Sequence, residues 1–266
     1  MRLKPLMTAF GLLATISIAA PAVATEHLVL VGGGERPVAA MQRFVDWAGG
    51  PRARLLMILW ATEYPKESYE SLREDFGALH PGSIEAAPLQ PLTPESRADF
   101  LKQLEAATGV FFSGGDQTRV MEVLKDTGLL DAIRAKHRGG TVFGGTSAGT
   151  AVMSRIMITG EGDFTVLDGT KVETREGLDL IRGVIVDQHF LKRQRENRLF
   201  GLLLQNPQQL GVGVNEDAAV LVTDSRHAEV VGGLVMIVDG RGGKDELHLT
   251  IVRPGQRYDL VKRRRE

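Results

Sequence analysis

Short apolar runs alternate with amphipathic segments along most of this chain. The runs predict strands, whereas segments whose apolar positions recur at helical spacing predict helices. The expected strands cover residues 27–31, 54–60, 109–112, 141–143, 184–186, 211–214, 218–223 and 234–238. The expected helices cover residues 38–48, 67–79, 117–136 and 195–204, with two more that begin at Thr93 and near Thr150. Thr93 is favoured as a helix start because Pro94 follows it in the first helical position.

The alternation of strands and helices favours a mainly parallel sheet, because each pair of parallel strands needs a connecting element between them. We therefore expect an α/β fold, a three-layer α/β/α sandwich. No repeat, low-complexity tract or Pro/Ser-rich linker divides the chain, so residues 25–266 are expected to form one domain. The last strands are expected to form antiparallel edge hairpins, and the basic run 262–265 is expected to lie in solvent.

The first residues have the pattern of an export signal. Arg2 and Lys4 form a basic start, residues 10–20 are apolar, and residues 22–24 read Ala-Val-Ala, an A-x-A cleavage pattern. An uncleaved membrane anchor or a buried first helix is the alternative, but the apolar stretch is shorter than the roughly 20 residues that span a bilayer. We expect a signal peptide over residues 1–24, cleavage after Ala24, and an exported chain, periplasmic or extracellular, with no stable membrane association.

Composition narrows the chemistry. The chain has 266 residues, 43% hydrophobic and 24% charged, which is typical of a globular protein. A formal net charge of −1 gives no general attraction to nucleic acid, so no nucleic-acid partner is expected. The absence of cysteine excludes a disulfide scaffold, a thiolate metal site and a cysteine nucleophile. Hydroxyl, carboxylate and histidine chemistry remains.

Ser147 is the most informative residue. It lies in Gly145-Thr146-Ser147-Ala148-Gly149, a G-x-S-x-G pattern between an expected strand and an expected helix. In that context a sharp turn exposes the serine oxygen at the carboxyl end of the sheet, and small neighbours let backbone and substrate approach. The alternative interpretation is a glycine-rich turn whose serine caps the helix.

A serine nucleophile needs a base, and the base needs an orienting carboxylate. His189 follows the expected strand 184–186, where active-site loops of open α/β sheets gather, and we expect it to be the base. Glu216 likewise follows an expected strand. Asp187 and Asp217 compete with it for the orienting role, and the spacing leaves that choice open.

Backbone N–H groups are the expected donors to the oxyanion of a tetrahedral intermediate. The N–H of Ala148, directly after the serine, is the natural first donor. A second donor is expected at Gly115, in a glycine turn between a strand and a helix start. Gln117 offers amide hydrogen bonds in the same turn. The alternative is a tight turn in which Asp116 caps the helix.

Arg193, Arg195 and Arg198 follow His189 closely. Guanidinium groups bind carboxylates through paired hydrogen bonds, so a cluster beside the nucleophile would select an acidic substrate. Arg195 and Arg198 share a helix face, whereas Arg193 joins them only if the segment starts outside the helix. The alternative is a solvated basic face opposite the leucines of the same helix.

Together, residues 111–117, 144–149, 187–198 and 215–217 resemble the cyanophycinase family of serine exopeptidases. The resemblance covers nearly all of residues 25–266, with one departure at Thr150, where a smaller alanine is expected. It implies a fold like the class I glutamine amidotransferases and a homodimer. It also implies Ser147 as nucleophile, His189 as base and Glu216 as the acidic third member. The implied substrate-pocket residues are Gln117, Asp187, Gln188, Arg193, Arg195 and Arg198.

The implied activity is hydrolysis of cyanophycin, a poly-aspartate backbone with arginine on each side-chain carboxyl. β-Aspartyl-arginine dipeptides would be released through an acyl-enzyme, and no metal or organic cofactor is expected. The closest alternative is an aspartyl or isoaspartyl dipeptidase that uses the same residues on smaller peptides. An alternative from another class is a non-catalytic module that binds acidic peptides, and the intact Ser147, His189 and Glu216 argue against it.

Overall fold

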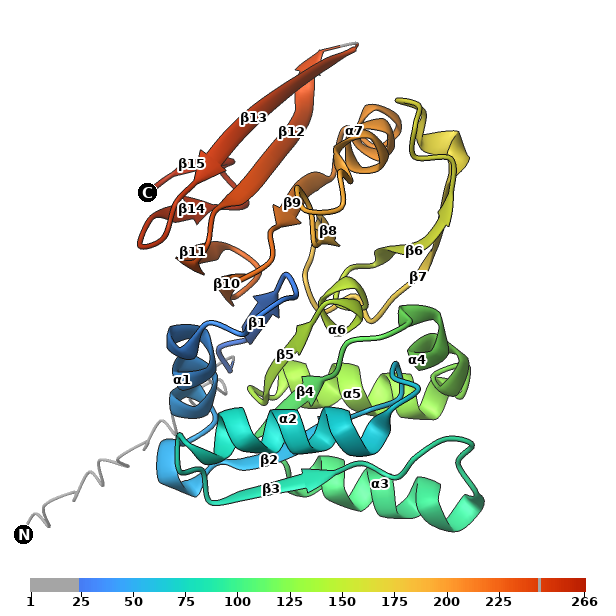
Figure 1. Cartoon of the computed structure of the whole chain (residues 1–266), viewed down its shortest axis with the longest axis vertical. Helices are drawn as coiled ribbons and strands as arrows, with labels where there is room; N and C mark the ends of the chain where they lie inside the picture. The colour runs from blue at the N-terminus through green and yellow to red at the C-terminus, as the bar shows by residue number, and fades with distance from the viewer. Residues whose placement is uncertain (1–23, 244) are drawn as a thin grey trace, which may run out of the picture.

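The computed structural model describes residues 24–243 and 245–266 (Figure 1). The export signal expected in the first residues therefore lies outside the described part of the chain, except for Ala24. No helix within the described residues is both long and apolar enough to span a membrane.

A nine-stranded sheet forms the centre of the molecule, and one strand of its parallel half leads into Ser147. The parallel strands, in spatial order, are β3 (Ser83–Ala86), β2 (Arg54–Ile58), β4 (Gly109–Phe112), β5 (Val142–Thr146) and β1 (His27–Val31). The antiparallel strands continue from β1 as β10 (Ala218–Thr223), β11 (His227–Gly232), β14 (Arg257–Asp259) and β15 (Arg264–Arg265). The expected mainly parallel sheet with an antiparallel edge is confirmed.

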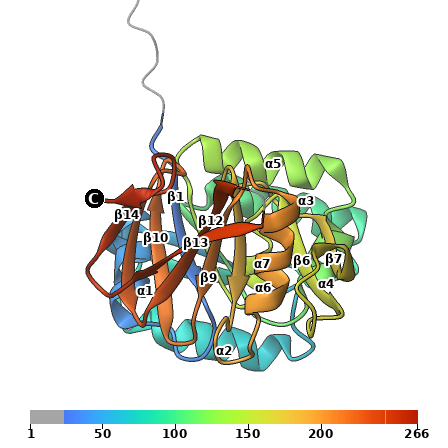
Figure 2. The same ribbon diagram turned by 90° about the horizontal axis from the view of Figure 1, so that it is seen from above.

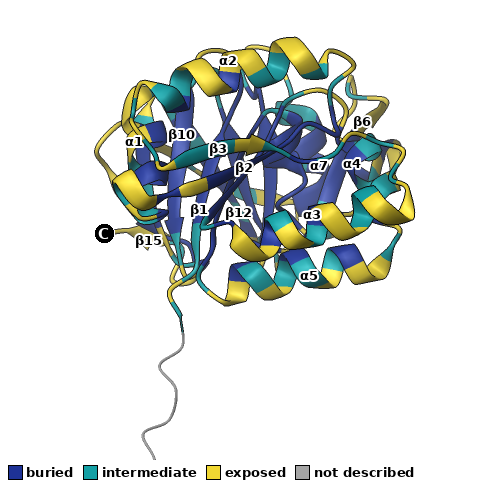
Figure 3. Ribbon diagram, turned by 90° about the horizontal axis from the view of Figure 1, so that it is seen from below, coloured by how far each residue is buried: buried dark blue, intermediate teal, exposed yellow. Residues whose placement is uncertain are grey.

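Helices cover both faces of this sheet, as Figures 2 and 3 show. One face is covered by α1 (Val38–Trp47) and α2 (Pro65–Gly77), and the other by α3 (Pro94–Ala106) and α5 (Thr127–Arg138). Alternate residues of β1 point to opposite faces of the sheet. Leu28 packs in the core between the sheet and helices α3 and α5, whereas Val29 packs in the core between the sheet and helices α1 and α2. The three-layer α/β/α architecture is therefore confirmed.

A second, four-stranded sheet lies beside the first and carries the other half of the site. Its strands, in spatial order, are β13 (Glu246–Val252), β12 (Val235–Gly243), β9 (Leu210–Val214) and β8 (Val184–Gln188). The helix α7 (Glu196–Gln205) packs Leu199 and Leu203 against this sheet. A two-stranded ladder follows the small helix α6 (Ala148–Ala151). It consists of β6 (Ile156–Gly162) and β7 (Val172–Glu176), and the short 3-10 turn η2 (Gly169–Lys171) precedes β7. Another 3-10 turn, η1 (Gly50–Arg52), lies between α1 and β2.

Three expectations about local structure were wrong. The segment expected as one helix over residues 117–136 is two helices, α4 (Gln117–Val123) and α5, because the Asp126 side chain accepts a hydrogen bond from the Gly128 N–H and starts a new helix. The strand expected at 141–143 continues to Thr146, since Gly144 and Gly145 pair with β1 and β4. Arg263 does not lie in solvent: its side chain is 8% exposed and contacts Asp239.

His137, on α5, makes the stability of the fold depend on pH. It is buried against Phe143, and neither ring nitrogen has a hydrogen-bond partner within residues 24–243 and 245–266. Burial lowers the pKa of His137 below its usual 6.5. The unfolded chain therefore takes up a proton near pH 6.5 that the folded chain binds only at lower pH, so the contribution to stability is full above pH 6.5 and declines as the pH falls below it.

We predict that His137→Leu flattens part of this decline, because leucine has no proton to gain on unfolding. The measurement is the urea unfolding free energy at pH 7.5 and pH 5.0 for wild type and variant. His248→Leu, at an exposed position on β13, is the control and should keep the wild-type difference between the two pH values. An unchanged pH dependence in His137→Leu would contradict the prediction.

Candidate active site

Ser147 stands on a sharp turn between β5 and α6. Its backbone has φ 53° and ψ −115°, a conformation that L-residues rarely adopt and that stores about 1–3 kcal/mol of strain. The flanking glycines explain how the turn fits. A Cβ on Gly145 would lie 2.3 Å from a backbone atom of Gly149, and one on Gly149 would lie 2.3 Å from the Phe112 carbonyl oxygen. The G-x-S-x-G pattern is thus required by the close approach of backbone to backbone.

The departure at Thr150 is accommodated without strain on this turn. Its hydroxyl is fully buried and lies 2.7 Å from each of two carbonyl oxygens, those of Val31 and Gly145. These carbonyls belong to β1 and β5, the two strands that end at the site. Thr150 therefore ties the start of α6 to the sheet.

His189 and Glu216 complete a hydrogen-bonded line with Ser147. His189 Nε2 lies 2.9 Å from Ser147 Oγ, and His189 Nδ1 lies 2.7 Å from Glu216 Oε1. The three side chains come from the ends of β5, β8 and β9 respectively. With Nδ1–H donating to the carboxylate, Nε2 is left to accept the proton of the serine hydroxyl.

The two competing carboxylates have other partners. Asp217 Oδ1 accepts a hydrogen bond from the Glu35 N–H at 2.7 Å, and Asp187 forms a buried ion pair with Arg198. The fold gives each of the three carboxylates a different partner, and only Glu216 is hydrogen-bonded to His189.

The glycine turn after β1 leaves space for the His189 imidazole, because its residues have no side chains. A Cβ on Gly33, whose φ is 108°, would lie 2.1 Å from His189 Cε1. The His189 N–H donates to the Gly32 carbonyl oxygen at 2.7 Å, which fixes the end of β8 to the end of β1. Sequence reasoning read residues 32–34 only as the end of a strand. The run of three glycines was the available signal that a side chain from elsewhere lies against this turn.

The surroundings of His189 hold its imidazole neutral. Burial lowers the pKa of His189, the hydrogen bond to Glu216 raises it, and the nearby Arg193 and Arg195 lower it, with a net shift below 6.5. A neutral imidazole can accept a proton, so the group is available as a base at neutral pH.

Two backbone N–H groups near Ser147 are free to bind an oxyanion. Within the described residues, neither the Ala148 N–H nor the Gly115 N–H donates to a protein acceptor. Gly115 adopts φ 133°, and the neighbouring Asp116 N–H is held by the Ala61 carbonyl oxygen at 2.9 Å. The expected donors are therefore both unengaged, one on each side of the serine turn.

A pocket of about 280 Å³, the β6–β7 pocket, opens beside Ser147. Its charged lining has both signs. Arg193 and Arg195 come from the loop after β8, and Glu161, Glu173 and Arg175 come from the β6–β7 ladder. Arg193 makes no ion pair within the described part of the chain, whereas Glu173 and Arg175 lie 3.2 Å apart. Residues of the ladder were missed by the sequence reasoning, because no periodic pattern there predicted strands.

Four of the six expected pocket residues line this pocket, and two do not. Gln117, Gln188, Arg193 and Arg195 line it. Arg195 donates to both the backbone carbonyl and the side-chain oxygen of Gln188, each at 2.7 Å, and burial lowers the pKa of Arg195 to about 10. The Gln117 side-chain amide donates to the carbonyls of Ile158 and Thr159, which holds α4 against β6.

Asp187 and Arg198 are each 1% exposed and are outside the lining of this pocket, unlike the other four expected pocket residues. Arg198 Nε donates to Asp187 Oδ2 at 2.7 Å, and its guanidinium lies 5.1 Å from the centre of the Phe164 ring. Two charges this deeply buried must pair with each other, and this pairing turns both away from solvent. They hold β8 and α7 together beneath Gln188 and His189.

Comparison with known proteins places the chain in a family. The model of peptidase family S51 matches residues 25–230. A cyanophycinase of Geminocystis herdmanii is 35% identical over 222 residues, which cover 80% of this chain and 80% of that protein. A cyanophycinase of Trichormus variabilis is 34% identical over 233 residues, which cover 85% of this chain and 77% of that protein.

Two solved structures have the same fold. A peptidase from an acI-B1 Actinobacterium superposes with a TM-score of 0.68 at 23% identity, over 89% of this chain and 97% of that one. A peptidase E protein of Listeria monocytogenes gives a TM-score of 0.53 at 14% identity, over 86% and 100%. At these identities the likeness concerns the fold alone. On its sequence match, the chain belongs to peptidase family S51, is a serine-type peptidase, and has cyanophycinases among its relatives.

Proposed function

We propose that this protein is an exported exopeptidase that hydrolyses cyanophycin to β-aspartyl-arginine dipeptides. The observation that carries the proposal is the line of Ser147, His189 and Glu216, which borders a pocket lined by both arginines and carboxylates. Each repeat of cyanophycin has a free carboxylate and a guanidinium, and a pocket of mixed sign suits such a zwitterion. The cyanophycinase relatives support the same substrate.

The proposed reaction begins with attack by Ser147 Oγ on the backbone carbonyl carbon of the substrate. His189 Nε2 takes the hydroxyl proton as the new C–O bond forms, and Glu216 stabilises the resulting imidazolium through Nδ1–H. The N–H groups of Ala148 and Gly115 are the proposed donors to the oxyanion. When the C–N bond breaks, His189 returns the proton to the departing amine and an ester to Ser147 remains.

Water then completes the cycle. His189, neutral again, takes a proton from a water molecule that attacks the ester carbonyl, and the same N–H groups bind the second oxyanion. Collapse of that intermediate breaks the ester bond, and the proton held by His189 goes back to Ser147 Oγ. The pocket groups Arg193 and Arg195 are proposed to hold the substrate carboxylate during both steps.

The test is incubation of the purified protein with cyanophycin and, separately, with β-aspartyl dipeptides, followed by mass spectrometry of the products. Release of β-aspartyl-arginine from the polymer is the expected result. Hydrolysis of the short peptides alone would favour an aspartyl or isoaspartyl dipeptidase of the same fold. Binding of cyanophycin without any hydrolysis would favour the non-catalytic module.

The pH profile tests the role of His189. We predict that the acidic limb of kcat/KM has its midpoint below pH 6.5, because the imidazole must be neutral and its surroundings lower its pKa. Arg193→Gln removes one of the cations that lower this pKa, so the limb should move to higher pH. Lys192→Gln, an exposed neighbour outside the pocket lining, is the control and should leave the limb in place. An unchanged midpoint of the acidic limb in Arg193→Gln would contradict the prediction.

We also propose that residues 1–24 are removed on export, to the periplasm or the medium, which leaves residues 25–266 as one domain. The basic start, apolar stretch and Ala-Val-Ala pattern support this. Cell fractionation and amino-terminal sequencing of the recovered protein test it, with Thr25 as the expected first residue. An intact amino terminus in the cytoplasmic fraction would overturn it.

A homodimer is a further part of the proposal. The edge strand β13 exposes Leu249 and Ile251, 49% and 43% accessible, and exposed apolar residues on an edge strand are a site for pairing with another chain. Light scattering after size exclusion should give twice the chain mass. A monomer at micromolar concentration would overturn this part and leave the proposed activity unaffected.

A further inference from the structure

The loop that carries His189 is held to the end of β9 by the side chain of Asn215. Strands β8 and β9 pair in parallel as far as Gln188 and Val214, and His189 is the first residue beyond that pairing. Its φ is 49°, in the left-handed region that L-residues rarely adopt and that persists only where the surroundings constrain the backbone. The contacts of this loop therefore decide where the imidazole lies.

Three successive N–H groups of the loop donate to acceptors outside it. The His189 N–H donates to the Gly32 carbonyl oxygen at 2.7 Å, and the Phe190 N–H donates to a carbonyl oxygen of β9 at 3.2 Å. The third, the Leu191 N–H, donates to the side-chain oxygen Oδ1 of Asn215 at 2.9 Å. Backbone carbonyls are present whatever the sequence, so this third hydrogen bond is the one that depends on the amino acid at position 215.

The backbone of Asn215 is itself fixed, and it leads directly into Glu216. A Cβ on Gly32 would lie 1.9 Å from the Asn215 carbonyl oxygen, so Asn215 packs against the glycine turn after β1. The next side chain, Glu216, places Oε1 2.7 Å from His189 Nδ1. Residues 215 and 216 thus hold the loop backbone with one side chain and the imidazole with the other. Loss of the first contact frees the second to lengthen.

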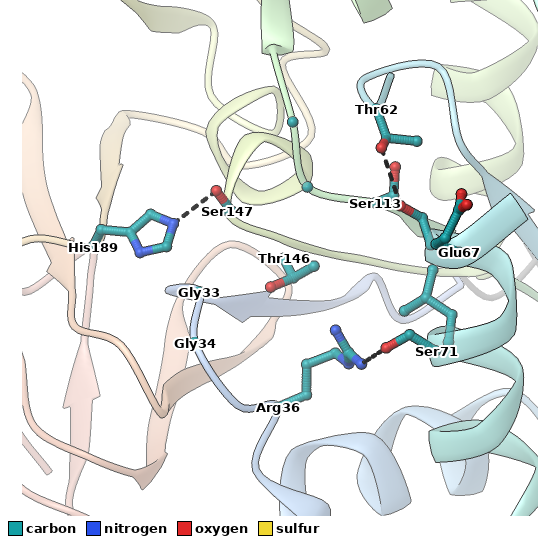
Figure 4. Close-up of a pocket in the computed structure, with 14 residues that line it drawn as sticks. Gly33, Gly34, Arg36, Thr62, Glu67, Ser71, Ser113, Thr146, Ser147 and His189 are labelled. Atoms are coloured by element: carbon teal, nitrogen blue, oxygen red, sulfur yellow. Dashed lines mark hydrogen bonds between the residues drawn. The ribbon is translucent and has the colours of Figure 1, made fainter. Parts of the chain in front are cut away.

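We propose that Asn215 is a positioning residue, whose side chain keeps His189 in hydrogen-bond contact with both Glu216 and Ser147. Asn215 is outside the lining of the β6–β7 pocket and of the cavity of about 450 Å³ that Ser147 and His189 also border (Figure 4), so it acts through His189. This inference rests on the proposed function, in which His189 is the base. Misplacement of a reacting group by about 1 Å costs on the order of 10²-fold in rate.

Kinetics of three variants test the proposal. Asn215→Ala removes the acceptor and is expected to lower kcat roughly tenfold or more, with KM within about threefold of wild type. Asn215→Asp keeps an acceptor oxygen in the same place, so its kcat is expected to return to within about threefold of wild type. Asn206→Ala is the matched control and is expected to keep the wild-type kcat. Asn206, at the carboxyl end of α7, is also partly buried, and its amide donates one hydrogen bond of 2.9 Å to the Leu202 carbonyl oxygen.

The pH profile separates a displaced imidazole from a general loss of structure. Burial lowers the pKa of His189, the hydrogen bond to Glu216 raises it, and Arg193 and Arg195 lower it. An imidazole displaced from Glu216 loses the contribution that raises its pKa, so the acidic limb of kcat/KM is expected to move to lower pH in Asn215→Ala. In Asn215→Asp the limb is expected not to fall, because the added carboxylate favours the charged imidazole. Other charges around the imidazole are the same in wild type and Asn215→Ala: Glu216, Arg193, Arg195, Arg36, Glu67 and Asp217.

A measurement that needs no substrate separates this inference from the proposed function. The NMR resonances of the histidine ring nitrogens show which nitrogen carries the proton and at which pH the ring titrates. Those of His189 are identified by their absence from His189→Gln. In wild type the neutral ring is expected to carry its proton on Nδ1, whereas Asn215→Ala is expected to show a mixture of tautomers and a lower pKa. If wild type hydrolyses no peptide, the proposed function fails and this titration still decides the role of Asn215.

Two results would overturn the proposal. One is a folded Asn215→Ala with wild-type kcat and unchanged His189 resonances. The other is an Asn215→Asp variant whose kcat is no higher than that of Asn215→Ala. If Asn215→Ala does not fold, Asn215→Ser takes its place, because serine is polar but too short to reach the Leu191 N–H.

Discussion

Replacing Ser147 with alanine should reduce kcat for release of β-aspartyl-arginine from cyanophycin by a factor on the order of 10⁴ or more. The variant loses the oxygen that lies 2.9 Å from His189 Nε2, and no covalent intermediate can form without it. Alanine at this turn has the same backbone strain as serine, so the fold should be retained. Single-turnover assays with product detection by mass spectrometry measure the loss.

Binding is the informative companion measurement for this variant. Because the lining of the β6–β7 pocket is otherwise unchanged, Ser147→Ala should bind cyanophycin with a Kd within a few fold of the wild-type KM. Ser83→Ala, on the far edge strand β3, is the matched control and should keep full activity. Turnover by Ser147→Ala within tenfold of wild type would show that another group is the nucleophile.

Replacing Arg198 with methionine should lower the free energy of unfolding by about 3–5 kcal/mol. The change removes the nearer of two guanidinium groups from the Asp187 carboxylate, which is 1% exposed, and leaves only Arg195 Nη1 at 3.8 Å from its Oδ1. Urea denaturation at pH 7.5 measures the effect. Because Asp187 and Arg198 lie beneath the loop that carries His189, activity should fall together with stability.

A double variant separates the buried charge from the lost packing. In Asp187→Asn/Arg198→Met a neutral amide replaces the buried carboxylate, so most of the lost stability should return. Arg257→Met is the control for an exposed pair: Arg257 lies 3.1 Å from Glu229 and is 63% exposed, so its loss should cost less than about 1 kcal/mol. A double variant as unstable as Arg198→Met would show that methionine disrupts the packing instead.

Much of the site could be predicted from the residues that follow the predicted strands. Ser147, His189 and Glu216 each follow a strand that the apolar pattern identifies, and the ends of neighbouring strands gather at one edge of an α/β sheet. The sequence pattern did not indicate which of Glu216, Asp187 and Asp217 orients His189. That choice depends on which long-range partner each carboxylate meets, Arg198 in one case and the Glu35 N–H in the other.

The charged lining of the β6–β7 pocket was even less predictable from the sequence. The arginines after His189 suggested a single carboxylate-binding cluster, but Arg198 turns inward because α7 packs against the second sheet. Carboxylates from the β6–β7 ladder make the pocket mixed in charge. These side chains lie far from Ser147 along the chain, and no local periodicity records their approach.

The sequence by itself determined the alternation of strands and helices, the glycine-flanked serine turn and the positions of its strand-end partners, because each depends on contiguous residues and on local backbone preferences. The tertiary structure alone decided the hydrogen-bonded line through Glu216, the inward pairing of Arg198, the burial of Arg263 and the mixed charge of the β6–β7 pocket beside Ser147. These features come from packing between segments distant in the chain, where burial forces every charge to find a partner.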